Sequence, residues 1–185
     1  MAVTDVCVGG DGGPLIVLQS TAAAQWQGAN DFDNSLMNGG DVETDYDVIC
    51  DCSDVGEITV VHRYDRDMLV LWDSEFTATR LASEALSLPP GAIVLTLGYD
   101  EADLADVLPR IVERLNAGNP ERSLSLEVMD PVMRLQVGAD SPLPTYNYEY
   151  LDIPITPGRK RCDVYVVKSE SLEDEVVVIQ EDEAK

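Results

Sequence analysis

The sequence predicts a mainly β protein of the α+β class. Two similar β units should pack as a sandwich or as bent antiparallel sheets, with one amphipathic helix inserted at about 101–117. Three observations predict this architecture: short β-branched apolar runs recur between turn residues, only one segment has helical periodicity, and the pattern of 58–99 returns at 125–166. With 185 residues and 45% hydrophobic content, the chain is sized for a single domain, 1–185.

The first half of the chain predicts strands and one short helical segment. Residues 21–27 offer one or two helical turns. Residues 46–52 alternate polar and apolar side chains, with Val48 and Cys50 on one face, which predicts a strand. Further apolar runs predict strands at 14–19, 58–62, 68–72 and 92–99, of which the second and third should form a hairpin.

The helix at 101–117 has recognisable ends. Asp100 can cap its start, and Asn116 and Gly118 favour its termination. Pro109 should kink this helix or divide it in two, because proline lacks the backbone N–H that an interior position uses. Its apolar stripe at helical spacing consists of Leu104, Val107, Leu108, Ile111, Val112 and Leu115.

The second half returns to strands, at 124–129, 133–137, 146–155, 161–168 and 176–180. Residues 181–185 are expected to be a solvated acidic tail. The internal repeat rests on a shared plan, in which an Asp-Ser loop is followed by a Pro-Gly turn of the type II kind. These motifs are Asp73-Ser74 with Pro90-Gly91, and Asp140-Ser141 with Pro157-Gly158.

The charge is strongly one-sided. The chain has 35 acids and 12 Lys and Arg, a formal charge of -23, and no Lys or Arg before Arg63. Phosphate backbones and anionic membranes repel such a protein, so we expect neither nucleic acid nor membrane as a partner. The short basic run is 159–161. A basic protein partner fits this charge, but a salt-adapted host would also select it for solubility, so a non-enzymatic binding or scaffold module is the alternative.

Patterns of catalysis or cofactor binding are scarce. His62 is the single histidine, and the Gly-rich segment 9–14 precedes a strand, whereas a dinucleotide loop follows one. Asp31 and Asp33 match the start of a calcium loop, but Leu36 occupies the position that needs glycine. We therefore expect no enzyme, no cofactor and no metal, and an enzyme using paired acids is less favoured. We find neither a signal peptide nor a membrane-length apolar run, which predicts a cytoplasmic protein.

Acids are concentrated in a Gly- and Asn-rich segment, 31–47, which we interpret as a partner-binding loop. Two further acids, at 73 and 75, are expected near it. The predicted contact residues are Asp31, Asp33, Asp41, Glu43, Asp45, Asp47, Asp73 and Glu75.

The order of several short motifs carries a resemblance. The motifs are Gly12-Gly13-Pro14-Leu15, Trp26-x-Gly28, Asp45-Tyr46-Asp47, Val70-Leu71-Trp72-Asp73 and, before a late strand, Ile153-Pro154-Ile155-Thr156-Pro157-Gly158. In this order they resemble the Immunity protein 21 family of bacterial polymorphic toxin systems, over about 12–168. The resemblance implies a cytoplasmic protein that binds and neutralises a cognate toxin and has no catalytic residues. Many such toxins are nucleases with a basic cleft, which an acidic surface can occupy. The oligomeric state stays open.

Overall fold

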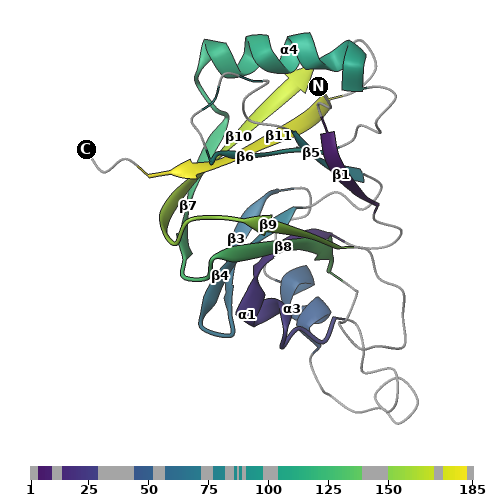
Figure 1. Ribbon diagram of the computed structural model, residues 1–185. Coiled ribbons are helices and arrows are strands. Elements are labelled where there is room, and N and C mark those ends of the chain that lie inside the picture. The colour runs from purple at the N-terminus through teal and green to yellow at the C-terminus, as the bar shows by residue number, and fades with distance from the viewer. Residues whose placement is uncertain are drawn as a thin grey trace.

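The fold is a stack of four layers, in which two antiparallel sheets lie face to face and helices cover their outer faces (Figure 1). The computed structural model describes residues 4–9, 14–28, 44–51, 57–71, 77–81, 86, 88, 91–97, 104–138, 150–168 and 173–182. The mainly β class and the packing of two antiparallel sheets are confirmed.

The two sheets differ in size. Sheet A has six strands, in the order β1 (Thr4–Gly9), β5 (Thr77–Leu81), β6 (Ile93–Leu97), β11 (Glu173–Glu181), β10 (Gly158–Lys168) and β7 (Arg122–Val128). Sheet B has five strands, in the order β3 (Thr59–Arg63), β4 (Arg66–Leu71), β2 (Leu15–Gln19), β8 (Val132–Val137) and β9 (Tyr150–Pro154). The described helices are α1 (Ser20–Ala23), α3 (Asp45–Asp51) and α4 (Leu104–Ala117).

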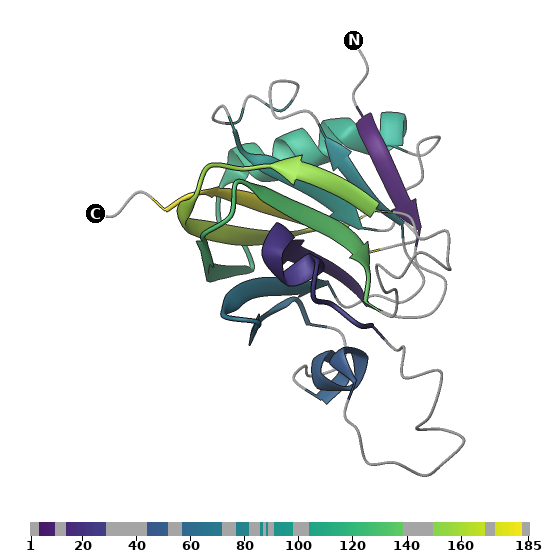
Figure 2. The ribbon, with the colours of Figure 1, turned by 60° about the horizontal axis from the view of Figure 1, so that its bottom comes forward.

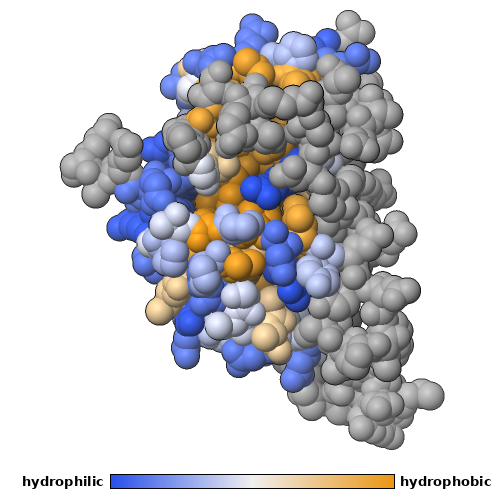
Figure 3. Space-filling model, in the orientation of Figure 1, coloured by the Kyte–Doolittle hydropathy of each residue, from blue (hydrophilic) through white to orange (hydrophobic). Residues whose placement is uncertain are grey.

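The largest hydrophobic core lies between the sheets. Leu15 and Val17 from sheet B meet Leu95 and Val177 from sheet A in this core. Alternate residues of each strand point to opposite faces. Figure 3 shows apolar residues gathered at the level between the sheets, with hydrophilic residues over α4.

Each sheet also buries its outer face. Ile111 of α4 packs against Val94 and Val178 on the outer face of sheet A. On the outer face of sheet B, Trp26 and the helices α1 and α3 cover β2 and β4. Figure 2 turns this side of the molecule forward. Because both faces are covered, every residue of β2 and of β6 is buried, which explains their continuous apolar runs.

The prediction of a strand at 46–52 is wrong, because Asp45–Asp51 is the helix α3. Over seven residues, alternation and helical spacing fit the same side chains almost equally well. In the helix, Ile49 is buried against sheet B, and Asp47 and Asp51, four residues apart, are exposed. A polar cap at Thr44, described below, favours the helix.

The helix α4 continues through Pro109, so the predicted division does not occur. Pro109 is exposed, which places its ring away from sheet A. Pro109 costs the helix one backbone hydrogen bond. Burial of Ile111 and its apolar neighbours against sheet A outweighs this loss, so the helix continues.

The strands of the two predicted repeat units are β3 to β6 and β7 to β10. β4 and β8 lie on either side of β2, and β6 and β10 lie on either side of β11. β3 and β5 occupy sheets B and A, but β7 and β9 occupy sheets A and B. The second and fourth strands of the units therefore hold equivalent places, whereas the first and third exchange sheets.

Two residues of the expected solvated tail, 181–185, are described. Glu181 is exposed, is the last residue of β11 and forms an ion pair with Lys160. The Asp182 amide donates to the Arg159 carbonyl oxygen at 3.2 Å. The prediction for 183–185 lies outside the described residues.

A polar network ties the corner where the chain passes from sheet A to sheet B. The buried Gln19 side chain donates to the carbonyl oxygens of Asp67 and Glu127 at 3.0 and 2.8 Å, and accepts from the amides of Met129 and Asp130 at 2.7 and 3.2 Å. Both hydrogen-bonding groups of the amide are thus used.

Asp130 completes this corner. Its carboxylate accepts from the Thr21 amide at 2.7 Å, the Thr21 hydroxyl at 2.6 Å and the Arg66 Nε at 3.3 Å. Burial alone would raise the pKa of Asp130, but these bonds outweigh burial and hold its pKa below the usual range. The carboxylate is therefore ionised where it joins α1 to the β7–β8 turn.

Asp130→Asn should lower the free energy of unfolding by about 1–3 kcal/mol at neutral pH, because it weakens these bonds. The folded-state pKa of Asp130 is below its unfolded value, so its contribution is complete above about pH 4 and declines as the pH falls through the folded-state pKa. In urea unfolding, the difference in the free energy of unfolding between wild type and Asp130→Asn should therefore become smaller as the pH is lowered. Glu113→Gln, at an exposed position of α4, should change stability by less than about 0.5 kcal/mol. A difference that stays constant down to about pH 2 would contradict the assignment.

Candidate protein-interaction surface

A buried carboxylate, Asp45, organises the outer side of sheet B. Asp45 is 3% exposed. It accepts from the Gln27 amide at 2.7 Å, the Arg63 Nε at 3.0 Å and the Tyr64 hydroxyl at 2.6 Å, and the Arg63 Nη2 lies 2.9 Å from it. We call these residues the Asp45 junction. It joins the chain after Trp26, the start of α3 and the β3–β4 turn.

The β3–β4 hairpin predicted from the sequence is confirmed, and its turn depends on this junction. Arg63 pairs with Arg66 across Tyr64 and Asp65, whose φ angles are 54° and 55°. This left-handed conformation suits the hairpin, but it costs a non-glycine residue about 1 kcal/mol or more. The hydrogen bond from Tyr64 to Asp45 offsets part of that cost. Burial, followed by this hydrogen bond, raises the pKa of Tyr64 to about 12.

The same junction brings together the two ends of the acidic segment. The Tyr46 amide donates to the Gly28 carbonyl oxygen at 3.2 Å, beside the bond from Gln27 to Asp45. Gly28 and Tyr46, which flank residues 29–43 in the sequence, therefore lie side by side. The predicted contact acids Asp31, Asp33, Asp41 and Glu43 belong to this segment and lie outside the described residues, as do Asp73 and Glu75.

Trp26 fixes the start of the segment to sheet B. Its side chain is 1% exposed, and its Nε1 donates to the Gly138 carbonyl oxygen at 2.9 Å. A Cβ at position 138 would lie 2.6 Å from Ile49 Cδ1 and 2.9 Å from the Pro14 oxygen. Only glycine therefore lets Ile49 and Pro14 lie this close to the backbone at position 138.

Asp47 has a local structural role as well as an exposed position. Its Oδ2 accepts from the Thr44 amide at 2.9 Å and the Thr44 hydroxyl at 2.7 Å, while the Asp47 amide donates to Thr44 Oγ1 at 3.1 Å. The bond from the Thr44 amide, followed by that from its hydroxyl, lowers the pKa of Asp47. This is a capping box, and the Thr44-x-x-Asp47 pattern could have indicated the helix from sequence.

The structure thus separates the two predicted contact acids that it describes. Asp45 lies inside the fold and positions other segments, whereas Asp47 is exposed on α3. Sequence reasoning missed Gln27, Arg63 and Tyr64, because nothing in their order along the chain indicates that they meet one carboxylate.

The exposed acids of α3 and of the hairpin turn form what we call the sheet B acidic surface: Asp47, Asp51 and Asp65. Among the described residues, the side chains of Asp51 and Asp65 form no ion pair. In contrast, most described bases are paired with acids of the same chain: Arg63–Asp45, Arg66–Asp130, Arg114–Glu121, Arg122–Glu57, Arg134–Asp152, Arg159–Asp182, Lys160–Glu181 and Arg161–Asp163. The basic run 159–161 therefore carries no unpaired charge.

Other parts of the described chain offer less chemistry. A groove of about 510 Å³ lies between α4 and β10, but Arg110, Arg114, Glu113 and Glu121 line it with balanced charge. Burial raises the pKa of Cys162 to about 12, so this thiol is a poor nucleophile. Within the described ranges, no cluster of three or more His, Cys, Asp or Glu is placed to hold a metal ion. No helix in those ranges is long and apolar enough to cross a membrane.

Comparison with known families gives one match. The model of the family described as Immunity protein 21 matches residues 7–171. No curated protein and no solved structure matches the chain.

Asp45→Asn should loosen the junction, because the neutral amide loses the ion pair with Arg63 and one acceptor oxygen. We expect a loss of about 2–3 kcal/mol in the free energy of unfolding. Hydrogen exchange measured by NMR should accelerate at the Gln27 and Tyr46 amides. Exchange at the Val177 amide in the core should accelerate only as far as the loss of global stability requires. Asp51→Asn is the matched control on the same helix and should leave all three amides near wild type. Unchanged exchange at Gln27 in Asp45→Asn would show that the junction does not hold the segment.

Proposed function

The chain belongs to the Immunity protein 21 family, and we propose on that basis that it binds and neutralises a cognate toxin of basic surface. The contact surface is the sheet B acidic surface together with the acids of 31–47 predicted from the sequence. Blocking of a basic cleft requires no catalysis, so we assign the protein no enzymatic role. A nuclease toxin fits this charge, because nucleases present a basic cleft to their substrate.

The observation that carries the proposal is the contrast between paired bases and unpaired exposed acids. The side chains of Asp51 and Asp65 form no ion pair within the described residues, so a basic partner would supply their counter-charges. Paired bases at 159–161 leave no site for phosphate, which supports a protein partner over nucleic acid or an anionic membrane. Toxin and immunity protein would meet in the cytoplasm.

The proposed contacts divide into two kinds. Asp31, Asp33, Asp41, Glu43, Asp73 and Glu75 stay as proposed contacts from the sequence, and Asp47, Asp51 and Asp65 join them. Asp45 is a positioning residue, because its carboxylate is buried in the junction and acts through the segments that it joins.

A second candidate is a binding or scaffold module whose acidity reflects a salt-adapted host. Asp106 and Glu113 are exposed on α4, at the opposite end of the layers, which favours a general solvation role for part of the charge. The two candidates differ in molar salt: host adaptation predicts higher stability there, whereas a charge-steered complex forms more slowly.

Asp51→Lys should slow association with the cognate toxin, tested as the product of the gene adjacent to this one, about threefold to tenfold at low salt, because it reverses charge on the proposed contact surface. Glu113→Lys makes the same charge change on α4 and should alter association less than about twofold. Stopped-flow or surface plasmon resonance measures both rates. Lys at the C-terminal end of α3 also suits the helix dipole, so Asp51→Lys should fold normally.

A second variant tests the acidic segment itself. Replacing Asp31, Asp33 and Asp41 with Asn and Glu43 with Gln should slow association further, with little effect on global unfolding. Equal effects of Asp51→Lys and Glu113→Lys would mean that net charge alone matters and would remove the surface assignment. If that gene product does not bind the wild-type chain at all, the toxin proposal is overturned.

A further inference from the structure

From the outer face of β8 and β9 we infer that Tyr150 is the aromatic anchor of the partner interface, where it takes an Arg or Lys side chain of a basic protein. This inference rests on the proposed function and deepens it. The acids would steer the partner, and Tyr150 would slow its release.

Tyr150 is unusually placed for a large hydrophobic residue. It is 45% exposed, whereas the other described large hydrophobics apart from Met129 are buried or half-buried. Its strand neighbours Leu151 and Ile153 face the core between the sheets, with Leu151 packed at the margin of that core. Because side chains alternate along a strand, Tyr150 and Asp152 stand on the outer face of sheet B.

The ring is held by a neighbouring ion pair. The Arg134 guanidinium carbon lies 3.9 Å from the Tyr150 ring centroid. Arg134 is itself fixed by two bonds to Asp152, from Nε to Oδ1 at 2.7 Å and from Nη2 to Oδ2 at 3.0 Å. Asp152 lies directly opposite Arg134 in the β8–β9 register, and Tyr150 lies on the diagonal. The exposed ring is therefore ordered before any partner binds, which lowers the entropy cost of using it.

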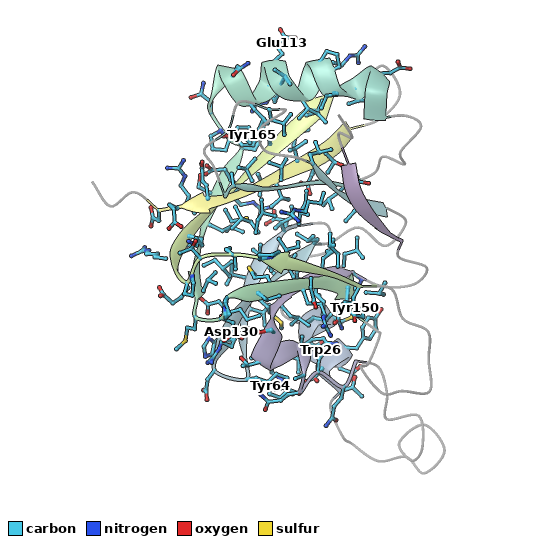
Figure 4. All side chains as sticks on the ribbon, viewed as in Figure 1. Trp26, Tyr64, Glu113, Asp130, Tyr150 and Tyr165 are labelled. Carbon is cyan, nitrogen blue, oxygen red and sulfur yellow. The ribbon has the colours of Figure 1, made fainter. Side chains whose placement is uncertain are left out.

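This ring lies near Trp26, one of the described residues that precede the acidic segment. Tyr150 pairs with Gln136, two residues before Gly138, whose carbonyl oxygen accepts from Trp26. Two residues of strand span about 7 Å. Figure 4 shows Tyr150, Trp26 and Tyr64 together on this half of the molecule. Tyr150 and Trp26, which directly precedes Gln27 of the Asp45 junction, thus lie at the same end of β8.

The charge around the ring selects a cationic partner group. Asp152 neutralises Arg134, and α3, which carries the exposed Asp47 and Asp51, covers the outer side of the same sheet. A partner Arg or Lys over the exposed ring gains a cation–π contact in an acidic setting. Tyrosine and arginine are also the residue types that most often dominate interface energies.

The test measures association and dissociation rates of the adjacent gene product with wild type, Tyr150→Ala, Tyr150→Phe and Tyr150→Glu. Tyr150→Ala should raise the dissociation rate at least about tenfold with association within about twofold, and Tyr150→Phe should stay near wild type. Tyr150→Glu separates the two kinds of attraction. Added acidity would strengthen a purely electrostatic complex, whereas loss of the anchor weakens it.

Met129→Ala is the matched control, because Met129 is also an exposed large hydrophobic residue, at 57%. It lies just before the start of β8, at the opposite end of that strand from Gln136, which pairs with Tyr150. It should change neither rate more than about twofold. Thermal unfolding midpoints equal to wild type would exclude a folding defect in any variant. Wild-type binding with unchanged dissociation in Tyr150→Ala, or tighter binding in Tyr150→Glu, would overturn the inference and leave the proposed function standing. Absence of wild-type binding would overturn both.

Discussion

The outer side of sheet B depends on the hydrogen bonds and the ion pair that the buried Asp45 carboxylate forms. A buried carboxylate is stable only when donors replace the water that it has lost, and here an amide, a guanidinium and a phenol do so. These donors come from three separate segments, so satisfying one charge fixes their relative positions. The same contact holds a left-handed hairpin turn and lies beside the hydrogen bond between Tyr46 and Gly28.

The layered core explains why this outer side must be covered at all. Both sheets carry apolar residues on both faces, because β2 and β6 are buried throughout. The helix α4 covers sheet A as a single long element, whereas α1, Trp26 and α3 cover sheet B piecewise. Short elements bring little stability of their own, so polar links such as the Asp45 junction hold them in place.

Sequence patterns predicted the elements whose periodicity is long or unambiguous. The strands β2, β6 and β8, the β3–β4 hairpin and the helix α4 follow from apolar spacing and turn residues. The helix α3 does not follow from the sequence pattern, because its seven residues fit the periodicity of a strand as well as that of a helix. Its polar cap and the burial of Ile49 decide in favour of the helix. Charge alone placed Asp45 among the contact acids, and only the tertiary meeting of Gln27, Arg63 and Tyr64 shows that it is structural. Tyr150 could not be recognised either, because its exposure depends on how β8 and β9 pair.

We propose that the partner binds the sheet B side and leaves the α4 side uncovered. Hydrogen-exchange mass spectrometry of the complex with the adjacent gene product tests this most directly, since it maps protection over the whole chain in one experiment. We expect slower exchange in α3, the β3–β4 turn and β9, and unchanged exchange in α4. Protection confined to α4 and the groove beside β10 would contradict it.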